Sequence, residues 1–129
     1  MTIYTDGVHL VTDQVDLGEL HDFAGRLGLM RRWFHNGDHY DLTTRAKAIA
    51  AVQAGAVLIA ARELGYVVMR RRWRKAGTQV EDGDPVQLRE GWTPTPLDPA
   101  RAADKNDSLM RRFRKFAGRR RIARRAAAE

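Results

Sequence analysis

The sequence predicts an α/β fold: a small domain of two or three layers, in which short strands alternate with two helices, followed by a basic helix at the C-terminal end. Three observations lead to this prediction. The chain has 129 residues, 43% of them hydrophobic, which is enough for one core but hardly for two. Strand-like and helix-like patterns alternate through residues 1–69. Beyond Met69 the chain becomes basic, with seventeen Lys and Arg against eight Asp and Glu.

The first part of the domain contains two short strands and a helix. Residues 3–5 and 8–12 are β-favouring runs. Asp16 is suited to cap a helix that stops at Gly28, because Glu19 follows it three residues later, as in a capping box. Residues 29–34 then favour another strand.

The second part of the domain repeats this alternation. Thr43 or Thr44 can cap a helix over residues 45–54, and its spacing places Ala46, Ile49 and Ala50 inward. Residues 57–60 form the continuous apolar run typical of a buried strand. A turn or short helix over residues 61–65 and a further strand over 66–69 complete the predicted domain, 1–69.

The rest of the chain is a basic segment, a linker and a helix. Residues 70–75 are a basic hexapeptide around Trp73. Residues 76–108 hold all four prolines, which predicts a linker or a loop wrapped over the domain. A basic amphipathic helix or tail is expected over residues 109–129, with Asp107 or Ser108 as its cap and an apolar stripe that contains Leu109, Met110, Phe113 and Phe116.

Composition excludes several classes of site. With no cysteine, the chain can form neither disulfides nor cysteine-ligated zinc sites. Ser108 is the sole serine, which argues against a serine nucleophile, and no glycine-rich phosphate loop is present. The sequence assigns no particular cofactor and leaves open whether one is bound. The N-terminus lacks a secretory leader pattern and no apolar run approaches the ~18 residues of a membrane span, so a soluble, cytoplasmic protein is expected.

The stretch 38–44 is the best candidate for an active site. His39, Tyr40 and Asp41 precede a helix start, and a histidine oriented by a carboxylate is suited to general acid–base work near neutral pH. His9 and His21 could converge with them. Three imidazoles and a carboxylate would also suffice for a divalent metal, but no metal site is assigned. The structural alternatives are a hydrogen-bonded core histidine for His21, a half-buried aromatic for Tyr40 and a helix cap for Asp41.

Several blocks of this region resemble a bacterial and phage family known as domain of unknown function 4031. The blocks are Asp-Gly-Val-His-Leu-Val at 6–11, Glu-Leu-His-Asp-Phe-Ala at 19–24, Leu-Gly-Leu at 27–29, Arg-Trp-Phe at 32–34, His-Tyr-Asp-Leu-Thr at 39–43 and Ala-Gly-Ala at 54–56. The resemblance covers about residues 2–65. It implies a small phage or actinobacterial accessory protein and no particular activity, and it marks the five candidate residues above as signature positions.

The basic segments are predicted to bind nucleic acid, DNA or RNA. Arginines can contact phosphates and the interleaved aromatic residues can stack on bases. The residues assigned to this role are Arg70, Arg71, Arg72, Trp73, Arg74, Lys75, Arg111, Arg112, Arg114, Lys115, Arg119, Arg120, Arg121, Arg124 and Arg125. A solvated tail is the plain alternative, and the apolar stripe could instead dock in a groove of a partner or, less readily, on an anionic membrane surface.

The sequence therefore leads to two hypotheses. The first is an accessory protein that binds nucleic acid through its arginine-rich half and carries a hydrolytic, phosphodiester-processing site at the histidines. The second is a non-enzymatic regulator or inhibitor whose basic helix docks on acidic host proteins. Whether the chain is an enzyme is left open by the sequence.

Overall fold

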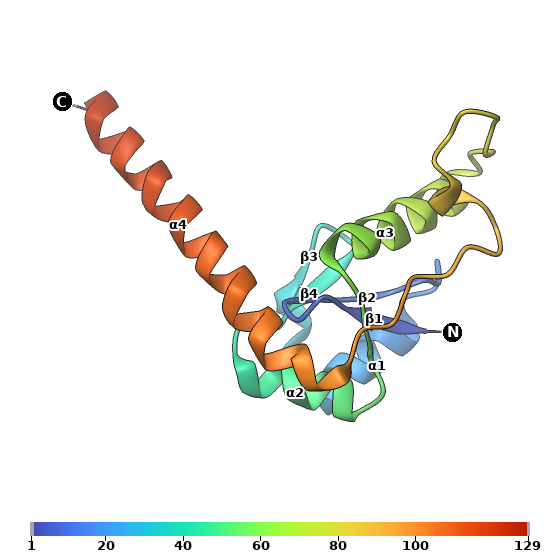
Figure 1. Ribbon diagram of the computed structural model, residues 1–129, viewed down its shortest axis with the longest axis horizontal. Coiled ribbons are helices and arrows are strands. Elements are labelled where there is room, and N and C mark those ends of the chain that lie inside the picture. The colour runs from blue at the N-terminus through green and yellow to red at the C-terminus, as the bar shows by residue number, and fades with distance from the viewer. Residues whose placement is uncertain (1, 129) are drawn as a thin grey trace.

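A computed structural model describes the backbone of residues 2–128 and the side chains of residues 2–115. Within that range the chain forms a five-stranded sheet and four α-helices, a mixed α/β fold (Figure 1). The strands are β1 (Ile3–Thr5), β2 (His9–Thr12), β3 (Phe34–His35), β4 (His39–Asp41) and β5 (Val57–Leu58). Their order across the sheet is β3-β4-β2-β1-β5, with β1 and β5 parallel and the other neighbouring pairs antiparallel.

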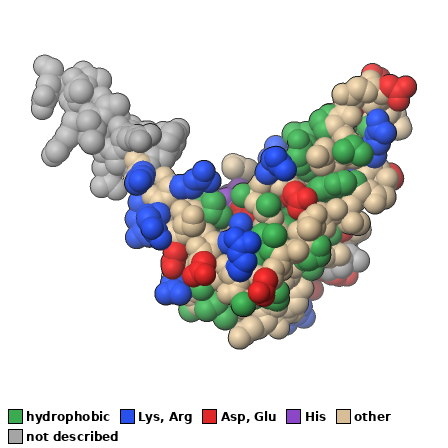
Figure 2. Space-filling view, viewed as in Figure 1, with side chains coloured by type: hydrophobic (Ala, Val, Ile, Leu, Met, Phe, Trp, Pro, Cys, Tyr) green, Lys and Arg blue, Asp and Glu red, His purple; other side chains and the backbone are tan. Residues whose placement is uncertain are grey.

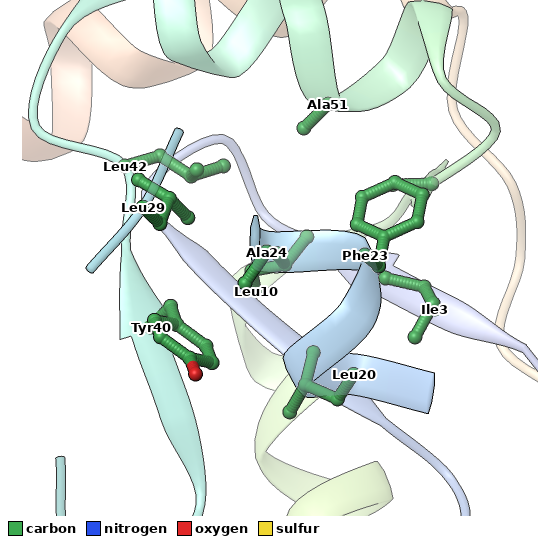
Figure 3. Close-up of a cluster of buried hydrophobic side chains, with 10 residues drawn as sticks. Ile3, Leu10, Leu20, Phe23, Ala24, Leu29, Tyr40, Leu42 and Ala51 are labelled. Atoms are coloured by element: carbon green, nitrogen blue, oxygen red, sulfur yellow. The ribbon is translucent and has the colours of Figure 1, made fainter. Parts of the chain in front are cut away.

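Each face of the sheet packs against its own helices. Because side chains alternate along a strand, Ile3 and Leu10 point to one face, where they join a cluster with α1 (Gly18–Arg26) and α2 (Arg45–Gln53) (Figure 3). Tyr4 and Val11 point to the other face and pack against α3 (Ala61–Ala76). The fold is thus a three-layer arrangement, and α3 contacts β1 and β2 on its side of the sheet.

A polar side chain caps the start of α2 but not the start of α1. Thr44 caps α2, as predicted, and accepts a hydrogen bond from the Lys47 backbone N–H at 3.2 Å. Asp16 is not the cap of α1: the helix begins at Gly18, and Asp16 instead accepts from the Gly18 N–H in a turn just before it. The predicted inward face of α2 is also wrong, since Ala48 and Ala51 are buried and Ile49 is exposed.

Helix α3 corrects the expectation of a strand at residues 66–69. One continuous helix of 16 residues runs from the end of β5 through the basic hexapeptide, and it ends at Gly77, which has a φ of 71°. Leu64 and Val67 face the sheet, and Arg70 and Arg71 are buried at the next positions of the same face. Residue 69, where the sequence places the end of a first domain, lies inside this helix.

The segment 77–101 wraps back over α3 and leads into α4 (Ala102–Ala128). It includes short 3₁₀ helices at Val86–Leu88 and Pro99–Arg101, and Trp92 packs edge-on against Tyr66 of α3. Asp98 accepts from the Ala100 N–H at 2.9 Å and so initiates the turn that continues into α4. The predicted cap at Asp107 or Ser108 is therefore wrong, because the helix starts several residues earlier.

The first turns of α4 are fastened to the domain. The buried Asn106 side-chain amide donates to the carbonyl oxygens of Gly7 and Leu42, at 2.9 Å and 2.8 Å. The backbones approach so closely that a Cβ atom on Gly7, whose φ is 102°, would lie 3.0 Å from the Cβ of Lys105. Beyond this base α4 extends away from the sheet, diverging from α3 (Figure 1). Within residues 2–128, no helix combines the length and apolar content needed to cross a membrane.

Candidate functional site

Four polar side chains gather on the face of the sheet on which α3 packs. In β4, His39 and Asp41 alternate with Tyr40 and so share one face. Strand pairing places His9 of β2 opposite Asp41, and His35 of β3 opposite His39. One ligand atom each of His9, His39 and Asp41 lies within 4.8 Å of the others. We call His9, His39 and Asp41 the histidine cluster, with His35 at its edge.

The imidazole of His9 is oriented by a buried carboxylate. Asp6, 2% exposed, accepts hydrogen bonds from the N–H groups of Val8 and His9 and from Nδ1 of His9 at 2.9 Å. Burial alone would raise the pKa of Asp6, but the hydrogen bond and charge of His9 outweigh it and leave that pKa lowered. Burial would likewise lower the pKa of His9, and the Asp6 carboxylate overcomes this and raises it. Nδ1 is therefore engaged by Asp6, and among the residues whose side chains are described Nε2 has no hydrogen-bond partner.

Asp41 lies between two imidazoles. Its Oδ2 is 3.1 Å from Nε2 of His35, and its Oδ1 is 3.5 Å from Nε2 of His39. Burial lowers the pKa of His39, and the positive charge of its histidine neighbours adds to this effect against the opposing pull of Asp41. His39 is therefore mainly neutral at neutral pH, with a lone pair available for a proton or a ligand.

Helix α4 reaches the histidine cluster at Phe113. The ring of Phe113 meets the His9 ring edge-on, with centroids 5.9 Å apart, while the His9 and His39 rings are 5.2 Å apart. In the space-filling view a histidine is visible in the hollow between the two diverging arms, α3 and α4, and cationic side chains are visible on the described base of the α4 arm (Figure 2). The cluster is thus half-buried at the base of a notch between α3 and α4, and Phe113 forms the part of α4 that meets it.

Two of the five predicted catalytic residues lie elsewhere. Tyr40 is 1% exposed and belongs to the core on the α1 face of the sheet (Figure 3). Its hydroxyl forms a 2.7 Å hydrogen bond with Nδ1 of His21, and burial raises the pKa of Tyr40. Burial and the nearby Arg31 lower the pKa of His21. The sheet therefore separates His21 and Tyr40 from His9, His39 and Asp41.

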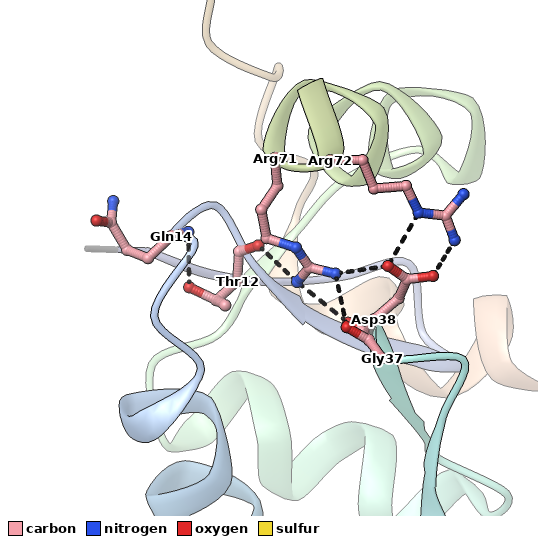
Figure 4. A network of polar contacts seen from close by, with 6 residues as sticks. All are labelled: Thr12, Gln14, Gly37, Asp38, Arg71 and Arg72. Atoms are coloured by element: carbon pink, nitrogen blue, oxygen red, sulfur yellow. Dashed lines mark hydrogen bonds and ion pairs between the residues drawn. The ribbon is translucent and has the colours of Figure 1, made fainter. Parts of the chain in front are cut away.

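The arginines at positions 71 and 72 of the basic hexapeptide hold the fold together. The buried Arg71 donates to Asp38 Oδ1 at 2.8 Å and to the carbonyl oxygens of Thr12, Gly37 and Asp38 (Figure 4). Arg72 pairs with both carboxylate oxygens of Asp38. Burial would raise the pKa of Asp38, but Arg72 and Arg71 together hold it below its ordinary value.

The other members of the hexapeptide are divided between the fold and the surface. Arg70 donates to the carbonyl oxygens of Arg89 and Trp92 and lies over the Trp92 ring. Arg74 pairs with Glu90. Trp73 is half-buried beside a hollow between the end of α3 and the segment 77–90, and Lys75 is exposed. The hexapeptide thus contributes less free cationic surface than its composition indicates.

Among the cationic side chains of α4 that the structure describes, Lys105 is half-buried and the others are exposed. The exposed ones are Arg111, Arg112, Arg114 and Lys115. Arg119, Arg120, Arg121, Arg124 and Arg125, together with Phe116, lie outside the residues whose side chains are described. Sequence reasoning did not select Arg101 and Lys105, which line a hollow beside the start of α3 together with Arg112.

His35 is a further residue of the site that the sequence prediction did not select, although the Asn-Gly pair that follows it is a recognisable turn sequence. Asn36 and Gly37 both have positive φ values, of 54° and 69°, and Asn-Gly is a common hairpin turn. A hairpin at this position pairs His35 with His39 across two strands. The turn sequence therefore allowed a prediction that His35 and His39, which flank the Asn-Gly-Asp segment, lie on the same face of the sheet.

Comparison with known proteins gives a family and no function. No curated protein and no solved structure matches the chain. The model of one family, described as "Protein of unknown function (DUF4031)", matches residues 5–72, which contain the last residue of β1, strands β2 to β5, α1, α2 and most of α3. The match covers more than half of the chain and confirms the resemblance noted in the sequence. The chain belongs to the family of proteins of unknown function DUF4031.

Proposed function

We propose that the protein binds nucleic acid along the basic face of α4 and processes a phosphodiester at the histidine cluster. The observation that carries this proposal is the contact between Phe113 and His9, because it brings the helix with the exposed cations to the chemical groups. Arg112 and Arg114 flank Phe113 in sequence, and both are exposed. A phosphate bound by these side chains would lie at the same turn of α4 as Phe113.

The electrostatics of the site support an anionic ligand. Arginine guanidinium groups bind phosphate oxygens with two parallel hydrogen bonds, and cations along a helix can follow a phosphate backbone. Arg101 and Lys105 extend the cationic surface toward the start of α3. Exposed Phe113 adds an aromatic ring on which a base could stack.

The chemistry of the cluster supports hydrolysis. Phosphodiester cleavage requires a group that activates the attacking water and a group that stabilises charge on the phosphate or the leaving oxygen. His39 has a pKa below its ordinary value and His9 has one above it, so His9 holds a proton more tightly than His39 does. Within the cluster, His39 is therefore the better proton acceptor and His9 the better carrier of positive charge.

The binding proposal is tested with charge variants of the full chain. Arg111, Arg112, Arg114 and Lys115 are changed together to Gln, and affinity for fluorescent DNA and RNA oligonucleotides is measured over a range of salt concentrations. The slope of log affinity against log salt is about −0.9 per phosphate contacted on duplex DNA, so we expect weaker binding and a slope shallower by about two to four units.

The matched control changes four exposed arginines of other elements, Arg26, Arg31, Arg32 and Arg62, to Gln. We expect this control to retain most of the affinity. Equal losses in the two variants, unchanged binding in the α4 variant, or equally tight binding of polyglutamate at the same salt concentration would each refute nucleic-acid recognition by α4.

The hydrolytic part is tested separately. Labelled DNA and RNA are incubated with the wild-type protein and with His39→Ala, in buffers that contain Mg²⁺, Mn²⁺ or Zn²⁺. We expect cleavage by the wild type, a loss of at least about 100-fold in His39→Ala, and retained cleavage in His21→Gln, because His21 lies across the sheet. If the wild type leaves every substrate intact, the hydrolytic role is refuted, and the binding role stands on its own test.

A further inference from the structure

The histidine cluster has the donor set of a transition-metal site. It offers two imidazoles and one carboxylate, and their ligand atoms lie within 4.8 Å of one another. All three residues are half-buried, and they come from two neighbouring strands of a rigid sheet. Imidazole and carboxylate together suit zinc, manganese and iron, whereas magnesium and calcium favour oxygen ligands alone.

The groups around the cluster are arranged like the outer shell of a metal site. In protein metal sites, the ligand histidine usually donates its second ring N–H to a carboxylate or carbonyl, which fixes its orientation. His9 does this with the buried Asp6, and Nε2 remains for a ligand. On the other side His35 contacts Oδ2 of Asp41, which leaves Oδ1 nearer to His39.

Metal binding requires the three ligand atoms of the histidine cluster to move slightly closer together. Around tetrahedral zinc at bond lengths of about 2.1 Å, ligand atoms lie about 3.4 Å apart. The cluster spans up to 4.8 Å, so side-chain rotations that move its atoms by about 1 Å bring the ligands to bonding distance. The half-exposed His39 and Asp41 can make this adjustment, while His9 stays fixed by Asp6.

We propose that His9, His39 and Asp41 bind one divalent transition-metal ion, of which zinc is the best-fitting candidate, with Asp6 as the positioning residue for His9. Three protein ligands leave at least one coordination position open, as in catalytic zinc sites. The open position would take water or a phosphate oxygen. A bound metal would replace the protonated imidazole as the positive charge of the site, and its water would replace the water activated by His39. In that respect the inference deepens the proposed function and rests on it, but metal binding itself is tested without nucleic acid.

The test is metal titration of the tag-free full chain. Isothermal titration with ZnCl₂ should give one site per chain, and Co²⁺ should give visible absorption bands that Zn²⁺ abolishes. His9→Ala and His39→Ala should each weaken zinc binding by at least about 100-fold, and Asp6→Asn by about 10- to 100-fold. Asp22→Asn, an exposed carboxylate of α1, is the matched control and should bind like the wild type.

The folded state of each variant is checked by circular dichroism, because Asp6 is buried among backbone N–H groups. If Asp6→Asn fails to fold, variants of the two more exposed ligands, His39→Gln and Asp41→Asn, still decide whether the cluster binds metal. Absence of a one-to-one site for Zn²⁺, Co²⁺ and Mn²⁺, or undiminished binding in His39→Gln and Asp41→Asn, would overturn the inference. Zinc binding without any nuclease activity would support the metal site and count against the hydrolytic role alone.

Discussion

Among single residues, the consecutive side chains at positions 38–41 serve different purposes. Asp38 anchors two arginines of α3, Tyr40 completes the core beneath the sheet, and His39 and Asp41 face the notch. The period of two along a strand is enough to separate Tyr40 from its neighbours. Sequence reasoning grouped all of them because it treated the stretch as a cluster and did not assign it to a strand.

Asp38→Asn should destabilise the fold. The substitution removes the carboxylate that pairs with the buried Arg71, and leaving a buried charge without its partner costs about 3 kcal/mol. Urea unfolding measures the loss. Asp82→Asn, at an exposed position, is the control, and similar losses in both variants would contradict the role assigned to Asp38.

The same carboxylate predicts a pH dependence. Because the pKa of Asp38 lies below its ordinary value of 3.8 in the folded protein, its stabilising contribution is complete above that value and is lost as the pH falls through the folded-state pKa. The free energy of unfolding of Asp38→Asn should therefore fall less steeply between about pH 5 and pH 2 than that of the wild type. Parallel pH profiles would refute this contribution.

Tyr40→Phe should leave the chemistry of the notch unchanged. The change removes only the hydroxyl that bonds His21, which should cost about 1 kcal/mol of stability. Zinc binding and any nucleic-acid cleavage should match the wild type, because the hydroxyl lies on the opposite face of the sheet. Loss of cleavage with the fold intact would place Tyr40 back among the catalytic residues.

At the scale of elements, the structure shows which patterns are readable in the sequence. The short strands 3–5 and 9–12 and the helix capped by Thr44 follow local rules of alternation and capping. The end of α3 does not follow these local rules, because Arg70 and Arg71 occupy buried positions where the buried face of a helix normally carries apolar residues. Their burial depends on carbonyl groups from distant segments, and local periodicity contains no information on such partners.

The inward face of α2 was unpredictable for a related reason. The helix packs both against the sheet and against α4, so no single apolar stripe identifies its buried side. Small alanines, Ala48 and Ala51, fill the contacts, and Ile49 remains exposed. A helix between two partners is thus positioned by volume more than by hydrophobicity.

Asn106→Ala tests how α4 is attached. The substitution leaves the buried carbonyls of Gly7 and Leu42 without their donor, which should cost about 2–6 kcal/mol, since each of the two unsatisfied buried groups costs about 1–3 kcal/mol. Thermal unfolding followed by circular dichroism measures the effect. Ser108→Ala changes an exposed residue of the same helix and should leave stability nearly unchanged. Equal losses of stability in the two variants would contradict the role of Asn106 in attaching α4.

At the scale of the whole molecule, the family-matched region 5–72 does not contain all the contacts that complete its core. Leu88 and Ala102 are buried at 2% and 1% exposure, and Ala102 packs with Ala48 and Leu58. Trp92 accepts the guanidinium hydrogen bond of Arg70 through its carbonyl oxygen. The segment predicted as a linker is therefore part of the folded unit.

A chain truncated after residue 76 should not unfold cooperatively. It keeps every strand of the sheet but loses Leu88, Ala102 and Asn106, so it leaves part of the core and two buried carbonyl groups open to water. Urea titration followed by circular dichroism should show a broad transition for residues 1–76 and a single sharp one for residues 1–115. A sharp transition in the shorter chain would show that the matched region folds by itself.

The hydrogen bond from Asn106 to Gly7 joins residues 99 positions apart in the chain. At a synthesis rate of about 5–20 residues per second, Asn106 is added to the chain about 5 to 20 s after Gly7. For that interval the face of the domain that later receives α4 is open to solvent and to chaperones. The domain therefore completes its fold only when its basic helix has begun to emerge, and a nascent chain stalled before residue 102 would expose that unfinished face.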